Sequence, residues 1–513
     1  MLGTVVLLAQ AAVAGPQVIT YTSALDGSAQ PYALYLSRSY DASRRYPLVI
    51  SLHGANSSHK LNLRRVFGQG NRPGELDFEA SRYFPPLREV DFIVAAPWAR
   101  GANIYEDLAE SEVYDVLADL KRRFSIDDDR VYLTGIGAGG GGALRLALTR
   151  PDIWAAVAAV CPAPSPDLEE LAGNALNLPI QIFHGERDPL IPVHVTRGWH
   201  KRLLEAGAPV EYTEYPGVRH NCWDRAYRDA RIFDWFARFR RPANPERVRF
   251  TTRWFRYRSS YWAEIDSLTP GSPASIEARV ASPGRIEVST RSLDGFTLSL
   301  ARATAGGMIS RAPVQVAIDG QLLRVKAARQ LSFHRAPKGW KSGRYVFAPG
   351  SKQPGAEGPL SQAFASRHAL VHGPGSPLLA VFAAGHRNAA PSIKPDHAVS
   401  PEDGNLILFG TKETNAVIAR YADRLPLELN AGAADYGLLF IAFVDGRYVV
   451  VSSGLPWWTG ADFARRDLAS LKDFILFRGS IENVIAEGYF DRDWKPLPEA
   501  GASLRASGAV VVK

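Results

Sequence analysis

The sequence predicts an α/β fold: a mostly parallel sheet with helices on both faces, then a small antiparallel β unit and a second, smaller α/β region. Three observations predict it. Short apolar runs alternate with amphipathic stretches between residues 46 and 239, as in a buried parallel sheet connected by helices. The prolines at 242 and 245 end this pattern, and alternation of period two follows. Apolar runs and a helical pattern return after residue 358.

The length of the chain indicates several folded units. At 513 residues it is too long for one ordinary core, and its 46% apolar and 22% charged residues are typical of a globular protein. We expect a first α/β domain at 15–241, an antiparallel β domain at 246–336 and a small α/β domain at 358–495. The stretch 338–357, rich in Gly, Pro, Lys and Ser, is predicted to be a linker or long loop.

Each predicted element of the first domain follows from a local pattern. Apolar runs bounded by turn residues predict the strands, and apolar residues at helical spacing predict the helices. The predicted strands are 46–52, 91–96, 131–134, 156–161, 180–184 and 210–215. The predicted helices are 109–124, one after Gly139, 195–204 and 226–239.

The later elements are predicted in the same way. In the antiparallel unit the strands are 285–290, 295–300 and 314–318, the last before a hairpin-type turn at Asp319-Gly320. In the second α/β region we expect strands at 368–371, 405–409 and 448–452, and a helix at 413–425.

The charge pattern makes some classes of binding partner less favourable than others. The net charge of +8 comes from scattered Lys and Arg rather than from runs, so it favours solubility over nucleic-acid binding. The apolar residues 1–14 end in Ala12-Val13-Ala14 and resemble the later part of a secretory signal. We therefore expect a secreted or periplasmic protein with no membrane span.

Neither of the two cysteines, Cys161 and Cys222, lies in a metal-ligand or CxxC spacing. The sequence thus predicts no metal and no cofactor. Two interpretations of the cysteines stay open: a pair of buried thiols, or one disulfide in an exported protein.

The most informative stretch is a strand that runs directly into a glycine-rich turn and a predicted helix. It contains Gly135-Ile136-Gly137-Ala138-Gly139, the shape of a nucleophile elbow of the form Gly-x-Ser-x-Gly. In such an elbow the serine occupies a strained turn, and small neighbours permit close packing. Here the central position is Gly137, which has no side chain to attack a carbonyl.

Three further candidate segments occur in the order along the chain that accompanies a nucleophile elbow. The loop after the strand 46–52 offers the backbone N–H of Ala55 or Asn56 to an oxyanion hole, with Ala138 as the second donor. Asp188, in His-Gly-Glu-Arg-Asp, follows a later strand, and His220 follows the last one. The order of nucleophile position, acid and base is that of a catalytic triad on this type of fold.

With these motifs, residues 30 to 240 resemble the secreted esterase and prolyl-oligopeptidase-like branch of the α/β-hydrolase superfamily. The resemblance implies an ester or peptide-bond hydrolase with Asp188 and His220 as triad members. The sequence departs from the family at Gly137, the position of the nucleophilic serine.

Three hypotheses follow from this departure. The chain is a degenerate hydrolase or ligand-binding protein; or it is a hydrolase that uses water activated by His220 and Asp188, or another nucleophile such as Ser57 or Ser58; or Gly137 was introduced into an active serine hydrolase. The first is our main prediction.

Four residues are predicted to border the cleft: Trp98, Arg100, Tyr105 and Trp223. They suit contact with an aromatic or acidic ligand, although ordinary packing explains them equally well. The expected partner is a small ester, peptide or oligosaccharide. The sequence does not specify an oligomeric state.

Overall fold

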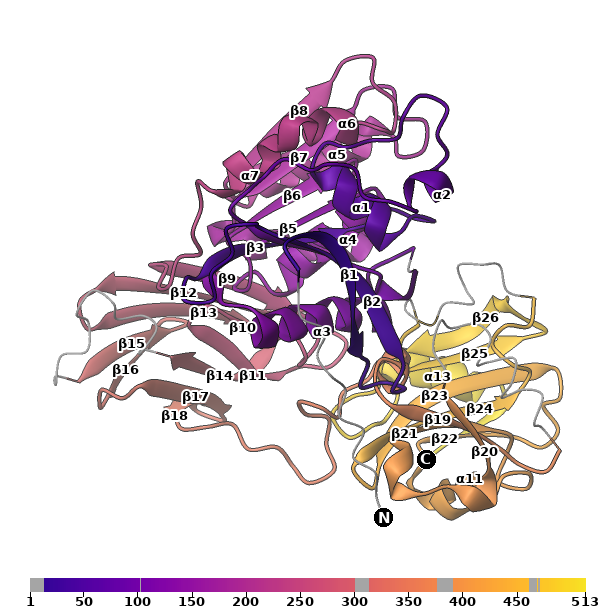
Figure 1. Cartoon of the computed structure of the whole chain (residues 1–513). Helices are drawn as coiled ribbons and strands as arrows, with labels where there is room; N and C mark the ends of the chain where they lie inside the picture. The colour runs from indigo at the N-terminus through magenta and orange to yellow at the C-terminus, as the bar shows by residue number, and fades with distance from the viewer. Residues whose placement is uncertain (1–12, 102, 300–312, 376–390, 461–467, 469–470) are drawn as a thin grey trace, which may run out of the picture. The chain divides into compact units, whose positions relative to one another are not determined.

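The computed structural model describes residues 13–101, 103–299, 313–375, 391–460, 468 and 471–513 (Figure 1). Most of the predicted export segment, 1–14, lies outside these residues. The chain divides into two compact units. The first comprises 1–22, 29–105 and 109–242, and the second comprises 23–28, 106–108 and 243–513. None of the helices in the described part of the chain is long and apolar enough to cross a membrane.

The first unit contains an eight-stranded sheet in the order β1-β2-β4-β3-β5-β6-β7-β8. Only the β1–β2 and β2–β4 pairs are antiparallel; all the others are parallel. The strands are β1 (Gly15–Thr22), β2 (Ala29–Leu36), β3 (Tyr46–Leu52), β4 (Ile93–Pro97), β5 (Ile126–Ile136), β6 (Ala156–Val160), β7 (Ile180–Gly185) and β8 (Val210–Tyr215).

Helices cover both faces of this sheet, as predicted. Alternate residues of β3 enter two different cores: Leu48 and Ile50 join one, and Val49 joins the other, because side chains alternate across a strand. The first core also holds residues of α3 (Leu108–Arg123), α4 (Ala138–Thr149) and α5 (Val193–Glu205). The second holds residues of α1 (His59–Val66), α6 (Trp223–Ala226) and α7 (Arg231–Phe236). The short helix α2 (Asp77–Ala80) follows α1.

The predicted final helix at 226–239 is wrong. The structure has the short helices α6 and α7, joined by a 3-10 turn at Arg228–Ala230 in which Asp229 and Ala230 have positive φ angles of 55° and 54°. This break lets the preceding residue, Tyr227, enter the core, where its hydroxyl lies 2.6 Å from Thr134 Oγ1. A buried hydrogen bond thus outweighs local helix propensity.

The second unit begins with two five-stranded sheets that share one apolar core. One has the order β10-β11-β14-β17-β18, and the other β16-β15-β13-β12-β9. The strands are β9 (Arg247–Thr252), β10 (Ser259–Ser260), β11 (Ala263–Leu268), β12 (Ala274–Ser282), β13 (Arg285–Arg291), β14 (Leu293–Ser299), β15 (Val314–Ile318), β16 (Gln321–Val325), β17 (Gln330–Ala336) and β18 (Gly339–Ser342).

Two predictions for this region need correction. The unit is not wholly antiparallel, because β13 pairs with β15 in parallel while β14 joins the other sheet. Nor is 338–357 a simple linker: it contains β18 and two buried charged residues. Lys352 forms an ion pair with Asp473, and the Glu357 carboxylate accepts hydrogen bonds from backbone N–H groups of 255 and 256. Composition alone does not reveal such tertiary partners.

The rest of the second unit contains a seven-stranded sheet in the order β20-β19-β21-β24-β23-β25-β26. The strands β20, β19, β21 and β24 run parallel, and the remaining pairs are antiparallel. The elements are α9 (Leu360–Phe364), β19 (His368–His372), β20 (Ser392–Pro395), β21 (Asn405–Phe409), α11 (Ala416–Tyr421), β22 (Leu427–Leu429), β23 (Tyr436–Val444), β24 (Arg447–Gly454), β25 (Phe474–Arg478), β26 (Ser480–Gly488), α13 (Pro498–Ala506) and β27 (Val510–Val512).

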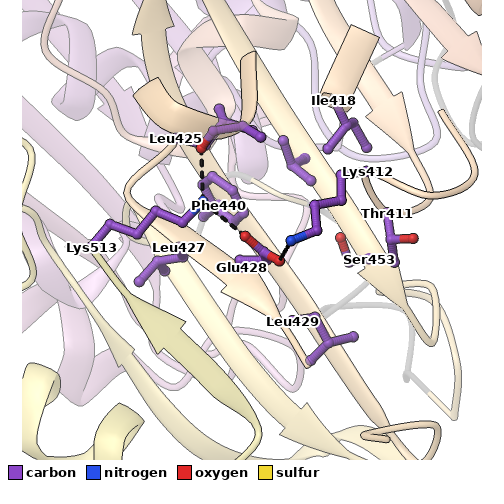
Figure 2. A pocket seen from close by; sticks show the side chains of 12 residues that line it. Thr411, Lys412, Ile418, Leu425, Leu427, Glu428, Leu429, Phe440, Ser453 and Lys513 are labelled. Atoms are coloured by element: carbon purple, nitrogen blue, oxygen red, sulfur yellow. Dashed lines mark hydrogen bonds and ion pairs between the residues drawn. The ribbon is translucent and has the colours of Figure 1, made fainter. Parts of the chain in front are cut away.

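The helix predicted at 413–425 is shorter than expected. Asn415 caps α11 through its side-chain oxygen, which accepts hydrogen bonds from Val417 and Ile418 N–H, and a 3-10 turn follows Tyr421. Beyond β21 and β24 lies a small pocket, which we call the strand-end pocket (Figure 2).

Candidate active site

Gly137 occupies the tight turn between β5 and α4, with φ 57° and ψ −114°, a conformation that is strained for a residue with a side chain. A Cβ atom at this position would lie 3.4 Å from His220 Nε2, at ordinary contact distance. The flanking glycines differ: a Cβ at Gly135 would lie 2.1 Å from Gly139 O, and a Cβ at Gly139 would lie 2.3 Å from Leu52 O. Packing therefore requires the flanking glycines but leaves space at the central one.

Asp188 and His220 meet at the carboxyl ends of β7 and β8. His220 Nδ1 lies 2.7 Å from Asp188 Oδ2, and Asp188 Oδ1 accepts hydrogen bonds from the N–H groups of Leu190 and Ile191 at 2.9 and 3.0 Å. The Asp188 side chain is fully buried, whereas that of His220 is 23% exposed. With Nδ1 bound to the carboxylate, Nε2 is the ring nitrogen that faces Gly137. We call Gly137, Asp188 and His220 the elbow site.

The surroundings keep Asp188 ionised. Burial alone would raise its pKa, but the hydrogen bonds from Ile191 N–H, from His220 and from Leu190 N–H outweigh burial, and the pKa lies below its ordinary value. His184 Nε2 lies 3.3 Å from Asp188 Oδ2, and burial lowers the pKa of His184. An ionised carboxylate beside His220 Nδ1 fixes the tautomer whose Nε2 accepts a proton.

Cys161 and Cys222 are buried free thiols, not a disulfide. The sulfur of Cys161, just after β6, lies within 4.8 Å of ligand atoms of both Asp188 and His220, a proximity that sequence spacing did not reveal. Burial raises the pKa of Cys161 well above its ordinary value, so the thiolate needed for nucleophilic attack or metal binding is disfavoured. Asp188 and His220 meanwhile bind each other. The thiol therefore serves packing in this arrangement.

The candidate oxyanion donors differ in whether their N–H groups already have a hydrogen-bond partner. Ala138 is the first residue of α4, so its N–H has no partner within the helix. The loop with the other candidates packs against the elbow, since a Cβ at Gly54 would lie 3.3 Å from Ile136 O. In that loop Asn56 N–H donates to Asn103 Oδ1 at 2.9 Å, which removes it as a free donor. Of the predicted pair, Ala55 remains.

Two of the four predicted cleft residues lie in the interior instead. Arg100 is 4% exposed and pairs with Glu112 at 2.9 Å. Tyr105 is 1% exposed, and its hydroxyl donates to His53 O at 3.1 Å. Trp98 is half-buried, and its ring stacks on His53 with centroids 5.6 Å apart. Ordinary packing in the interior therefore explains Arg100 and Tyr105.

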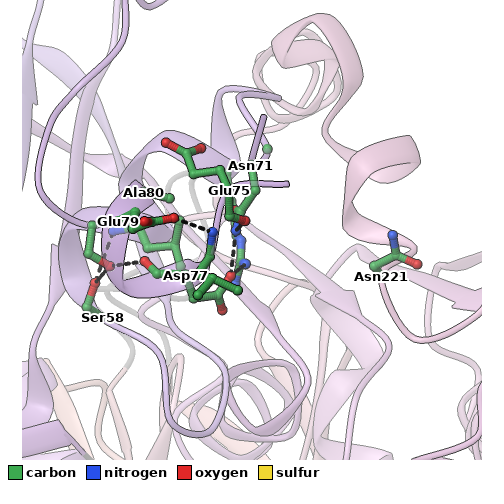
Figure 3. A network of polar contacts seen from close by, with 12 residues as sticks. Ser58, Asn71, Glu75, Asp77, Glu79, Ala80 and Asn221 are labelled. Carbon is green, nitrogen blue, oxygen red and sulfur yellow. Dashed lines mark hydrogen bonds and ion pairs between the residues drawn. The ribbon is translucent and has the colours of Figure 1, made fainter. Parts of the chain in front are cut away.

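Trp223, the fourth, contacts the elbow site directly. Its ring meets the His220 ring edge-on, with centroids 5.6 Å apart, and the Arg65 guanidinium lies 5.0 Å from the Trp223 ring. Arg65 also binds Asp77 Oδ1 at 2.9 Å, and Asn71 donates to the same atom at 2.7 Å. Figure 3 shows the polar network of this α1–α2 region. Arg65 was missed in the sequence, and the polar, basic composition of α1 does not single it out from its neighbours.

The predicted alternative nucleophile Ser58 has another role. Its hydroxyl caps α1 by accepting a hydrogen bond from Leu61 N–H at 3.2 Å, and it lies 3.0 Å from Ser81 Oγ. A hydroxyl held as a helix cap stabilises the helix start. The position of Ser58 therefore does not support a role for its hydroxyl as the nucleophile.

The sequence model of the dienelactone hydrolase family matches residues 98–239, which include the whole elbow site. No curated protein matches the chain. Among solved structures, a thermostable esterase is 24% identical over 44% of this chain and 63% of its own, with a TM-score of 0.35. This chain thus spans less than two thirds of that esterase.

Two ferulic acid esterases are also similar. One is 18% identical over 44% of this chain and 98% of its own, with a TM-score of 0.35. The other, from Anaeromyces mucronatus, is 19% identical over 43% and 88%, with a TM-score of 0.34. The sheet order and the elbow geometry give the first unit an α/β-hydrolase fold, and the family match lies within this unit.

Proposed function

We propose that the first unit is a degenerate α/β hydrolase that binds a small ester, peptide or oligosaccharide without forming an acyl-enzyme. One observation carries the proposal. Gly137 holds the backbone conformation of a nucleophile, and a Cβ there would touch His220 Nε2, yet the residue has no hydroxyl. Without a side-chain nucleophile, the covalent route has no first step.

The remaining groups suit the binding of a carbonyl compound. The N–H groups of Ala138 and Ala55 are the proposed donors to a carbonyl or carboxylate oxygen. His220 Nε2, oriented through Asp188, accepts or donates one further hydrogen bond. Trp223 supplies an aromatic edge beside it. These contacts bind and orient a ligand without requiring a chemical step.

A second candidate, slow hydrolysis by water, has one supporting observation. Among the described residues, His220 Nε2 has no hydrogen-bond partner, so this nitrogen is free to take a proton from a water molecule. In subtilisin, loss of the nucleophile costs about six orders of magnitude in kcat. We therefore expect any such activity to be near background.

The test restores the missing hydroxyl. We expect Gly137→Ser to hydrolyse p-nitrophenyl acetate and to be labelled by a fluorophosphonate probe, which reacts with an activated serine. Gly137→Ala is the matched control, because it adds the same Cβ atom without a hydroxyl. The double variant Gly137→Ser with His220→Ala removes the base, and we expect it to lose both labelling and turnover.

Three outcomes decide the proposal. Labelling of Gly137→Ser, but of neither the native chain nor Gly137→Ala, supports a site that lacks only its nucleophile. Rapid turnover by the native chain that His220→Ala abolishes would overturn the proposal in favour of the water route. If folded Gly137→Ser, checked by circular dichroism, neither reacts nor labels, the other groups do not form a competent site.

A further inference from the structure

One face of the sheet β16-β15-β13-β12-β9 in the second unit is rich in arginine (Figure 1). The opposite face carries Val248, Ile276 and Val288, which enter the core shared with the other five-stranded sheet. Because side chains alternate across a strand, the residues between these point away from that core. The outward positions hold six arginines and two glutamates, which we call the arginine face: Arg247, Arg249, Glu277, Arg279, Arg285, Glu287, Arg291 and Arg324.

The strand register brings together arginines that are far apart in the sequence. Arg247 of β9 lies opposite Arg279 of β12, and Gln315 of β15 lies between Arg285 and Arg324. Neighbouring strands are about 4.8 Å apart, so arginines of different strands lie within about 10 Å of one another. Like charges directly opposite each other in a sheet are destabilising. The fold therefore gains nothing from placing Arg247 opposite Arg279.

Glu277 holds two of these arginines in place. Its Oε1 atom binds the Arg247 guanidinium, and its Oε2 atom lies 2.9 Å from Arg249 Nε. Burial alone would raise the pKa of Glu277, but hydrogen bonds from Arg249 and Arg247 outweigh burial and lower the pKa below its ordinary value. A guanidinium has five N–H donors, so each arginine keeps donors for a further acceptor.

Glu287 binds two more arginines, and both stay accessible to solvent. Its Oε2 atom lies 2.5 Å from Arg279 Nη2, and its Oε1 atom lies 3.7 Å from Arg285 Nε. The side chains of Arg279 and Arg285 are 51% and 45% exposed. Within the part of the chain that the structure describes, Arg291 and Arg324 form no ion pair. The face is thus ordered in its middle and open to an anionic partner.

The arginine face has a net charge of +4, from its six arginines and two glutamates. Two further carboxyls border it. Glu246 directly precedes β9, and Asp319, in the turn after β15, lies 3.5 Å from Arg335 and is neutralised by it. With Glu246 counted, an excess of three positive charges remains.

The other five-stranded sheet of the same core has no such excess. The outward positions of its strands β11 and β18 hold Glu264, Asp266 and Lys341 as charged residues. The arginines are therefore gathered on one side of the shared core, although they are scattered along the chain. This asymmetry is what a binding surface for an anion requires.

The uncharged residues of the arginine face indicate the class of anion. Ser275, Ser289 and Gln315 stand at outward positions between the arginines and can form hydrogen bonds with hydroxyl groups. These five strands, which the structure describes in full, have no aromatic residue at an outward position, whereas sites for single-stranded nucleic acid stack bases on aromatic rings. Leu322 is the one large apolar side chain exposed on these strands, too little to anchor the sheet in a membrane.

We propose that the arginine face binds a linear polysaccharide whose sugars carry carboxylates. The planar guanidinium groups bind the carboxylates through paired hydrogen bonds, and Ser275, Ser289 and Gln315 bind sugar hydroxyls. An extended chain can cross several strands of the sheet and contact several arginines at once. The proposal is independent of the function proposed for the first unit, since it uses none of that unit's residues.

Calorimetric titration of the full chain with polygalacturonate tests the proposal. Its fully methyl-esterified form is the control polymer, because it has the same backbone without the charges. We expect polygalacturonate to bind at about 20 mM NaCl and to lose most of its affinity at about 0.5 M NaCl, where salt screens exposed charges. The methyl ester should bind at least tenfold more weakly than polygalacturonate.

Three variants locate the site. Arg279→Gln and Arg285→Gln each remove one exposed cation and should weaken polygalacturonate binding about threefold, the size of one exposed ion pair. Ser289→Lys adds a cation to the face and should strengthen binding, which a loss of folded protein cannot do. Arg424→Gln is the matched control, because Arg424 forms an ion pair with Asp445 at a similar exposure of 49% but lies outside this sheet. It should bind like the native chain.

Equal affinity for polygalacturonate and its methyl ester would overturn the role of the charges. Absence of polygalacturonate binding at low salt would overturn the site itself, as would binding that all three variants of the face leave unchanged. Tighter binding of a thymidine oligonucleotide of equal charge would overturn the polysaccharide as the partner and assign the face to nucleic acid.

Discussion

The elbow site and the strand-end pocket both lie where parallel strands of an α/β sheet end, yet their side chains suit different tasks. The elbow site pairs a carboxylate with an imidazole at 2.7 Å. The strand-end pocket pairs one carboxylate with two ammonium groups.

The comparison also shows how strongly the chemistry of a site can depend on a single atom. At the elbow site, Asp188, His220 and the turn at Gly137 lie together, and our proposal is that only a hydroxyl is missing. No histidine is among the residues that line the strand-end pocket. Four predictions test this contrast, in order of expected size.

The largest effect should come from Asp188→Asn in the Gly137→Ser background. An amide at this position stabilises the wrong tautomer of His220, which in serine proteases lowers kcat by about 10⁴-fold. We expect a similar loss in p-nitrophenyl acetate hydrolysis. Glu186→Gln in the same background is the control, because Glu186 lies in the same loop but accepts from Gly217 N–H at 2.7 Å. A loss below tenfold for Asp188→Asn would show that Asp188 does not orient His220.

The elbow glycines should differ sharply in their tolerance of a methyl group. Gly139→Ala places a Cβ atom 2.3 Å from Leu52 O and 2.6 Å from His53 O, and backbone must move to accept it. We expect the free energy of unfolding to fall by at least about 3 kcal/mol. Gly137→Ala meets nothing closer than 3.4 Å and should lose only the roughly 1 kcal/mol of its positive φ. Urea unfolding measures both, and equal losses would contradict the distinction.

Glu357 should make the second unit less stable as pH rises. Burial raises its folded-state pKa to about 7 from the ordinary 4.5. The folded chain therefore holds a proton that the unfolded chain releases between these values, and the free energy of unfolding should fall by roughly 3 kcal/mol across the window.

Urea unfolding at pH 4.5 and 7.5 measures this fall, and Glu357→Gln should reduce it. Glu112 of the first unit, whose pKa burial raises to about 8, adds a fall of its own that this variant leaves in place. The exposed Glu482 of the same unit serves as control, since Glu482→Gln should leave the fall intact. If native stability is flat across the window, the carboxyl is ionised in the folded state.

The smallest effect concerns the loop that carries Lys412. Asn415 is 1% exposed, caps α11, and donates from Nδ2 to Phe409 O at 3.1 Å. Asn415→Ala should cost about 1–2 kcal/mol of unfolding free energy. Asn415→Asp keeps the cap and loses only the donor, so it should cost less. If the alanine variant is as stable as the native chain, Asn415 does not hold this loop.

The strands of the first unit were largely predictable, because buried parallel strands are short and apolar throughout. Residues 46–52 match β3 end to end. Residues 210–215 match β8 as well, although this edge strand is only partly buried and contains polar residues. The predicted strand 91–96 is β4, shifted by two residues at its start and one at its end. The antiparallel strands β1 and β2 were missed. So were β23 and β25 in the second unit, whose continuous apolar runs do not by themselves separate strand from helix. The strand β26, in which polar residues interrupt the apolar ones, was also missed.

The residues of the elbow site were predictable from the sequence, but the contacts of the surrounding residues were not. The sequence alone determined that Gly137 occupies an elbow position and that Asp188 and His220 follow the strands that bring them there, because glycine spacing and strand order are written in the chain. Only the tertiary structure decided that Arg100 and Tyr105 are buried, that Asn56 N–H is occupied by Asn103, and that Lys412 and Lys513 meet at Glu428. These depend on contacts between distant segments, which local patterns do not encode.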